Sequence, residues 1–229
     1  MIRYSYCLNN PLKYVDPSGE LFNPIFDFNG NFLGTDDRGL QGEAIIMNKE
    51  NFRQNMSHAD ALETGYFRSQ LPKIMNQNIL DKIDNQVASF PNRPDWDGYL
   101  TDSEARNWWR NGNGQPLFVD QSKINLGLTS TRDFRNKTTI TRNFFFALEV
   151  DENTARVYGT LTLNLLDSNT GEVKIGKKNI AFIDEYDFDR HEGGNLFRNI
   201  ATWGARRIVG EGTPFNIYGY GKNPKVFKY

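Results

Sequence analysis

The fold class is decided by one stretch, Val157-Tyr158-Gly159-Thr160-Leu161-Thr162-Leu163-Asn164-Leu165, in which leucines alternate with polar residues. Successive side chains of a strand point to opposite faces, so this alternation predicts a half-buried antiparallel strand. The five residues Asp167-Ser168-Asn169-Thr170-Gly171 then predict a turn. Further strands are predicted at residues 172–175, 180–183, 213–220 and 225–229.

The part of the chain before this sheet is predicted to be helical. Residues 50–65 and about 68–89 have helical patterns, and apolar side chains recur on one face of the second segment. The clearest helix start is Thr101-Asp102-Ser103-Glu104, which fits a capping box, and this helix should stop at Asn111-Gly112. One more helix is predicted at about 195–209.

Together these patterns predict an α+β fold. An N-terminal helical half, about 50–113, would pack on a mostly antiparallel sheet, about 135–229, with one C-terminal helix. The apolar stripes of both halves need each other for burial, so residues from 21 onward are expected to form one unit. Ahead of both halves, Asn29-Gly30 predicts a tight hairpin turn between two apolar runs.

Composition excludes several classes of protein. The 229 residues carry a formal net charge of −1, so no basic field supports nucleic-acid binding, and nucleic acid is not an expected partner. Cys7 is the only cysteine, which excludes a disulfide framework and a Cys-rich zinc site. No apolar run approaches about 18 residues, so no membrane span is predicted. The first residues lack the apolar region of a signal peptide.

The first residues carry the most specific motif of the chain, Arg3-Tyr4-Ser5-Tyr6-Cys7-Leu8-Asn9-Asn10-Pro11-Leu12-Lys13-Tyr14-Val15-Asp16-Pro17-Ser18-Gly19. It resembles the closing signature of the Rhs repeat-associated core, a Tyr-rich strand followed by Asn-Pro and Asp-Pro-x-Gly. That family usually has Leu directly after the Gly, whereas Glu20 precedes Leu21 here.

The resemblance implies a modular protein. Residues 1–20 would be the tail of an Rhs core, and residues 21–229 the C-terminal effector, or toxin, domain of an Rhs-type polymorphic toxin. The implied role is in competition between bacteria, with the chain secreted or delivered to a target cell as part of a larger protein. The implied partners are the rest of the Rhs core and a cognate immunity protein.

Candidate chemistry is concentrated in Asp184-Glu185-Tyr186-Asp187-Phe188-Asp189-Arg190-His191-Glu192, which follows the strand predicted at 180–183. Five carboxylates in nine residues repel one another, so they stay solvated, share protons or are neutralised by a cation. One interpretation is a solvated acidic turn with Tyr186 and Phe188 as core anchors. The other is an oxygen-rich site for Mg²⁺ or Ca²⁺ with a histidine as general acid or base.

The start of this segment, Asp184-x-Tyr186-Asp187, resembles the catalytic motif of the colicin M-type bacteriocins, Asp-x-Tyr-Asp, five residues, then His-Arg. Those enzymes are metal-dependent phosphodiesterases that cut the lipid-linked peptidoglycan precursor. Here Gly193-Gly194 stand where the family has His-Arg, and His191 comes two residues earlier, after Arg190.

The resemblance implies a hydrolase of a phosphodiester or pyrophosphate bond in a lipid-linked cell-wall precursor, with Mg²⁺ as cofactor. Asp184 and Asp187 would hold the metal or orient water, Tyr186 would position the substrate, and His191 would be the general acid or base. Arg190 or Arg198 would stabilise charge on the departing phosphate. Two alternatives stay open: a non-catalytic adaptor, or pre-toxin domain, that links the core to a toxin or partner, and a nuclease-type toxin.

Two weaker features are expected to be structural. His58 follows Ser57 at a predicted helix start and is expected to be an ordinary surface or capping residue. Trp108 and Trp109 are expected to pack rather than to stack on a ligand.

Overall fold

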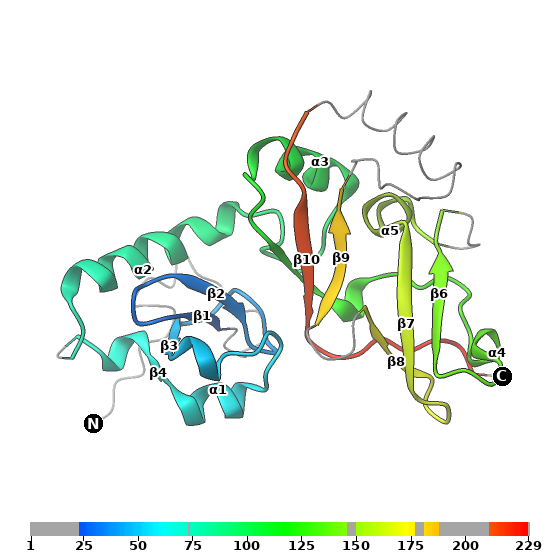
Figure 1. Ribbon diagram of the computed structural model, residues 1–229, viewed down its shortest axis with the longest axis horizontal. Coiled ribbons are helices and arrows are strands. Elements are labelled where there is room, and N and C mark those ends of the chain that lie inside the picture. The colour runs from blue at the N-terminus through cyan, green and yellow to red at the C-terminus, as the bar shows by residue number, and fades with distance from the viewer. Residues whose placement is uncertain (1–22, 73, 146–149, 177–180, 188–210, 229) are drawn as a thin grey trace. The chain divides into compact units, whose positions relative to one another are not determined.

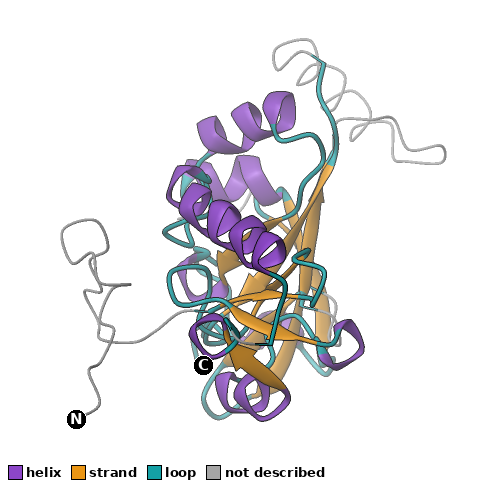
Figure 2. Cartoon of the chain, turned by 90° about the vertical axis from the view of Figure 1, so that its left-hand side faces the viewer, coloured by secondary structure: helices purple, strands orange, loops and turns teal. Residues whose placement is uncertain are grey.

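The structure, a computed structural model, describes residues 23–72, 74–145, 150–176, 181–187 and 211–228. It contains both helices and strands, which confirms the predicted α+β class (Figure 2). The chain divides into two compact units, residues 1–93 (unit 1) and residues 94–229 (unit 2). The predicted helical half, 50–113, is therefore shared between the units, and the division lies before the helix that starts at Thr101.

Unit 1 is built around a four-stranded sheet that the sequence did not predict as a whole (Figure 1). The strand order is β2-β1-β3-β4, with β1 parallel to β3 and the other neighbours antiparallel. Its strands are β1 (Pro24–Phe26), β2 (Phe32–Thr35), β3 (Ile45–Met47) and β4 (Gly65–Phe67). Its α-helices are α1 (His58–Thr64) and α2 (Gln77–Ser89). Its short 3₁₀ helices are η2 (Lys49–Asn51), η3 (Arg68–Gln70) and η4 (Phe90–Asn92).

Of two local predictions in unit 1, one is confirmed and the other is wrong in part. The hairpin predicted at Asn29-Gly30 is confirmed, because β1 and β2 pair antiparallel and Gly30 has the positive φ of 70° that such a turn requires. The helix predicted at 68–89 is wrong in its first part, because α2 begins only at Gln77. The side chain of Asn76 accepts from the backbone N–H of Asn78 and starts the helix there.

Unit 2 contains two three-stranded sheets and the remaining helices (Figure 1). One sheet has the order β5-β10-β9, with β10 parallel to β5 and antiparallel to β9, and the other is the antiparallel meander β6-β7-β8. The strands are β5 (Leu117–Asp120), β6 (Thr139–Asn143), β7 (Thr160–Asp167), β8 (Glu172–Ile175), β9 (Phe182–Tyr186) and β10 (Phe215–Tyr220). The helices are α3 (Asp102–Asn111), α4 (Thr131–Phe134), α5 (Glu152–Tyr158) and the 3₁₀ turn η5 (Gln121–Lys123).

One hydrophobic core joins the two sheets of unit 2 to α3 and α5. Leu161 and Leu163 of β7 are fully buried, as their alternation with polar residues predicted. Trp109 on α3 is buried in the same core, which confirms its expected packing role. The capping box is also confirmed, because Thr101 and Glu104 exchange the two expected hydrogen bonds at the start of α3.

Two strand predictions in unit 2 need correction. Val157 and Tyr158 are not part of the strand but the last turn of α5, and the chain reverses at Gly159, whose φ is +57°. Residues 225–228 make only isolated bridges, Glu172 with Lys225 and Ser130 with Phe227, instead of a final strand. The helix predicted at 195–209 lies outside the described residues.

Candidate functional site

The end of β9 carries the first residues of the acidic segment. In the antiparallel pair of β9 with β10, Asp184 lies opposite Ile217 and Tyr186 opposite Phe215. Directly opposite residues point to the same side of a sheet, so Asp184 and Tyr186 lie on the face that carries these two buried side chains. Asp184 is half-buried there, whereas Glu185, between them, is exposed.

Tyr186 anchors the end of the strand. Its side chain is only 4% exposed, and its ring stacks on Phe215 at 5.0 Å and meets Trp109 edge-on at 6.4 Å. Burial raises the pKa of the Tyr186 hydroxyl, and Asp102 raises it further, while Arg106 acts in the opposite direction. The hydroxyl therefore stays protonated and lies close to the charged side chains of α3. Whether Tyr186 also positions a substrate stays a prediction.

Asp184 belongs to a group that the sequence did not reveal, which we call the tyrosine–aspartate cluster: Tyr99, Asp151, Tyr158 and Asp184. Burial raises the pKa of the Tyr158 hydroxyl strongly, and Tyr99, Asp184 and Asp151 each raise it further by electrostatic repulsion of the phenolate. Tyr99, Asp151 and Asp184 therefore each lie within electrostatic reach of the Tyr158 hydroxyl. Tyr158, only 5% exposed, offers a neutral hydroxyl over the whole physiological pH range.

Hydrogen bonds hold this cluster against the starts of α3 and α5. The hydroxyl of Tyr99 donates to Asp151 Oδ1 at 3.4 Å and accepts from Asn153 Nδ2 at 3.0 Å. Asn153 Oδ1 in turn accepts from the backbone N–H of Asp102 at 3.0 Å. Asp151 is also the N-cap of α5, since its side chain accepts from the backbone N–H of Thr154 at 2.9 Å. Tyr99 and Asp151 are thus held in place at the starts of α3 and α5.

An ion-pair network ties α3 to α5 beside the cluster. Asp102 accepts from Nε and Nη2 of Arg106 and pairs with Arg156 at 3.3 Å. Arg156 also pairs with Glu152 one turn earlier on α5. Because several of these groups are partly exposed, each pair contributes little stability on its own. Together these ion pairs hold the guanidinium groups of Arg106 and Arg156 where α3 meets α5.

The protonation state of Asp151 should make unit 2 sensitive to acid. Burial alone would raise the pKa of its carboxyl, but hydrogen bonds from Thr154 and Tyr99 outweigh burial and hold the pKa below its ordinary value of 3.8. A carboxyl with a lowered pKa stabilises the folded state above the unfolded-state pKa, and this stability is lost as the pH falls through the folded-state pKa.

We therefore expect wild-type protein to be more stable than Asp151→Asn by roughly 0.5–1 kcal/mol at neutral pH, since Asn keeps a capping oxygen but loses the charge at the helix start. Urea denaturation at a series of pH values measures the difference. It should shrink towards zero below pH 3.8. A difference that grows as the pH falls would mean that burial, and not hydrogen bonding, dominates at Asp151.

The other residues predicted for the site are placed as follows. Asp187 comes directly after β9 and is half-buried. Arg190, His191 and Arg198 lie outside the described residues. Within the described ranges, no three His, Cys, Asp or Glu side chains gather as a metal site. Mg²⁺ commonly takes one or two protein carboxylates and keeps several waters, so Asp184 and Asp187 are a donor set that fits it.

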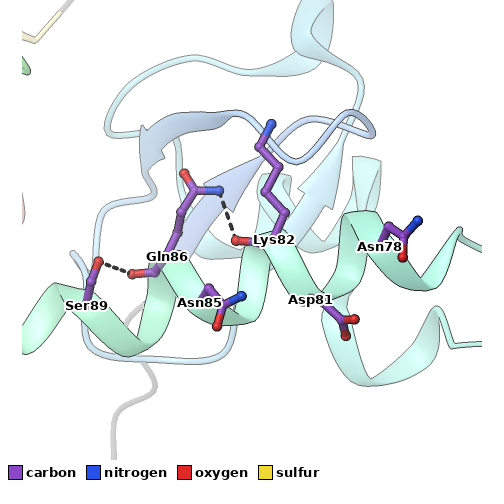
Figure 3. Close-up of a pocket in the computed structure, with 6 residues that line it drawn as sticks. All are labelled: Asn78, Asp81, Lys82, Asn85, Gln86 and Ser89. Atoms are coloured by element: carbon purple, nitrogen blue, oxygen red, sulfur yellow. Dashed lines mark hydrogen bonds between the residues drawn. The ribbon is translucent and has the colours of Figure 1, made fainter.

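An open hollow of about 580 Å³ runs along the polar side of α2 in unit 1 (Figure 3). The described residues that line it are Asn78, Asp81, Lys82, Asn85, Gln86 and Ser89. Lys82 Nζ donates to Asn29 O at 3.0 Å, and Gln86 Nε2 donates to Gly30 O at 2.9 Å. These donors hold the β1–β2 turn against the helix. The hollow thus has a structural explanation, and no histidine is among the described residues that line it.

In the part of the chain that the structure describes, no helix has the length and apolar character needed to cross a membrane. No family model, curated protein or solved structure matches the chain.

Proposed function

We propose that residues 21–229 are the C-terminal effector of an Rhs-type polymorphic toxin, and that unit 2 hydrolyses a phosphodiester or pyrophosphate bond in a lipid-linked cell-wall precursor. The support for an effector is the Rhs-like signature at residues 3–19. The observation that carries the hydrolase is the position of Asp184. It lies half-buried on the face of β9 that also carries buried side chains, within electrostatic reach of the buried Tyr158 hydroxyl, whereas a solvated acidic turn would leave it exposed.

The residues would divide the work as follows. Asp184 and Asp187 would hold a divalent cation, which would supply charge neutralisation at the phosphate. Tyr158 is neutral because burial raises its pKa, so its hydroxyl can donate a hydrogen bond to a phosphate oxygen without adding negative charge. His191 would be the general acid or base, and Arg190 or Arg198 would stabilise the departing phosphate.

The adaptor alternative keeps support for unit 1. Unit 1 is compact, and its four-stranded sheet lies in the sequence between the Rhs-like signature and unit 2. A separate unit at this place in the chain fits a pre-toxin domain that links a core to a toxin. We therefore assign the hydrolase to unit 2 and the linking role to unit 1.

The role as a toxin is tested by expressing the whole chain in bacteria without an immunity protein, once in the cytoplasm and once with an export signal. We expect growth arrest in the exported form, because the outer face of the cell membrane presents the lipid-linked precursor. The Asp184→Asn variant, expressed to the same level, should permit growth. Normal growth of cells with the wild-type chain in both compartments would leave only the adaptor role.

A further inference from the structure

Unit 1 contains a histidine–aspartate pair that the proposed function does not use. His58 is the first residue of α1, and its Nδ1 lies 2.8 Å from Oδ2 of Asp36. The Asp36 carboxylate is completely buried, whereas the imidazole of His58 is 15% exposed. The pair thus joins a buried carboxylate to a ring that solvent can reach. The expectation that His58 is an ordinary surface or capping residue misses this partner.

Both members of the pair are held in place by the backbone. Asp36 Oδ1 accepts from the N–H of Arg38 at 2.9 Å, and Asp36 forms a parallel bridge with Met56. The backbone N–H of His58 donates to Asp37 Oδ1 at 3.0 Å. Helix α1 begins at this point because Ser57 is its N-cap and accepts from the third residue of the helix. Backbone hydrogen bonds therefore hold both Asp36 and His58, and so fix the position of the imidazole ring.

The hydrogen bond decides which nitrogen of His58 is reactive. Burial raises the pKa of Asp36 above its ordinary value of 3.8, and its hydrogen bonds with His58 and Arg38 offset only part of this rise. A carboxylate that accepts from Nδ1–H leaves the lone pair on Nε2. Among the described residues, Nε2 has no hydrogen-bond partner. A ring with one nitrogen held by a carboxylate and the other free is the arrangement that general-base catalysis requires.

The surroundings of His58 indicate what it would act on. Asp37 binds its backbone, and Asp60 stands in the same first turn of α1. The ring of Phe67 lies 6.4 Å from the imidazole, centre to centre. Acidic and aromatic neighbours disfavour an anionic phosphate and suit a neutral or cationic group.

We propose that His58 and Asp36 form a second acid–base site, in unit 1, that hydrolyses neutral or cationic carboxylic esters or amides. In this step Nε2 of His58 takes a proton from water, and the water oxygen attacks the carbonyl carbon. The bond to the alcohol or amine then breaks, and the leaving group takes the proton from Nε2. Asp36 is a positioning residue that holds the Nδ1–H tautomer.

The experiment uses the whole chain and the neutral ester p-nitrophenyl acetate. The wild type should release nitrophenol faster than an equal concentration of free imidazole. His58→Gln should lower the rate about 100-fold. Asp36→Asn should lower kcat and leave KM unchanged, because the ring loses the carboxylate that holds its Nδ1–H tautomer.

The matched control is Glu63→Gln, which removes an exposed charge from the same helix but no contact of the ring, and it should keep the wild-type rate within about twofold. Equal rates for wild type and His58→Gln would overturn the proposal, as would a wild-type rate no higher than that of imidazole. If Asp36→Asn does not fold, the ¹⁵N spectrum of wild-type His58 decides: a neutral ring with its proton on Nε2 contradicts the proposal.

Discussion

Replacing Trp109 with alanine is expected to lower the free energy of unfolding by about 3–5 kcal/mol, the range for truncation of a large buried aromatic side chain. Trp109 is 1% exposed and lies in the core that joins α3 to both sheets of unit 2. A side-chain carbon added at Gly212 would come within 2.2 Å of its ring, so the chain before β10 packs directly on it. The ring also supports Tyr186 at the end of β9.

The adjacent Trp108 offers a matched control. It is only partly buried, and its indole N–H donates to Gln115 O at 2.8 Å near the end of α3. Trp108→Ala should therefore cost clearly less than Trp109→Ala in urea denaturation followed by circular dichroism. Equal losses for the two variants, or a loss below about 1 kcal/mol for Trp109→Ala, would mean that Trp109 does not hold α3 and β9 together.

Local chemistry made parts of the fold predictable. The capping box at Thr101 and the positive-φ turn at Gly30 depend on residues within a few positions of one another, and both are confirmed. The fold class follows from the alternation of Leu161 and Leu163 in β7. The strand was predicted to start too early, because buried apolar residues such as Val157 and Tyr158 fit a helix as well as a strand. Only the cap at Asp151 marks the helix, and it lies six residues upstream.

The candidate site could be predicted only where its residues are neighbours in the sequence. Asp184 and Tyr186 could be found because they lie two residues apart on one strand. Tyr99, Asp151 and Tyr158 come from the loop before α3 and from the two ends of α5, so no spacing in the sequence links them to Asp184. The contact of His58 with Asp36 is hidden for the same reason, because 22 positions separate them.

Replacing Asp184 with asparagine is expected to reduce hydrolysis by unit 2 at least about 100-fold. Losses of this size are typical when a group that acts in the chemical step is removed. The substitution keeps the shape and one acceptor oxygen but removes the charge that a cation needs. Its effect on stability should be small, since no large cavity forms. Circular dichroism and urea denaturation check that the variant is folded.

Glu185→Gln is the matched control for Asp184→Asn. It makes the same chemical change one residue further along β9, at a side chain that is exposed rather than half-buried. We expect this variant to keep wild-type activity. Equal loss of activity in the two variants would show that the overall negative charge of the segment matters, and not the position of Asp184 beside Tyr158.

The central claim, that Asp184 serves a metal-dependent hydrolase, is tested most directly by the release of phosphate-linked product from purified lipid-linked peptidoglycan precursor. The whole chain would be assayed with Mg²⁺ and with a chelator, as wild type, Asp184→Asn and Glu185→Gln. We predict product from wild type and Glu185→Gln in Mg²⁺ only, and a rate at least about 100-fold lower for Asp184→Asn. Folded wild-type protein that releases no product in Mg²⁺, or Asp184→Asn that matches it, would contradict the claim.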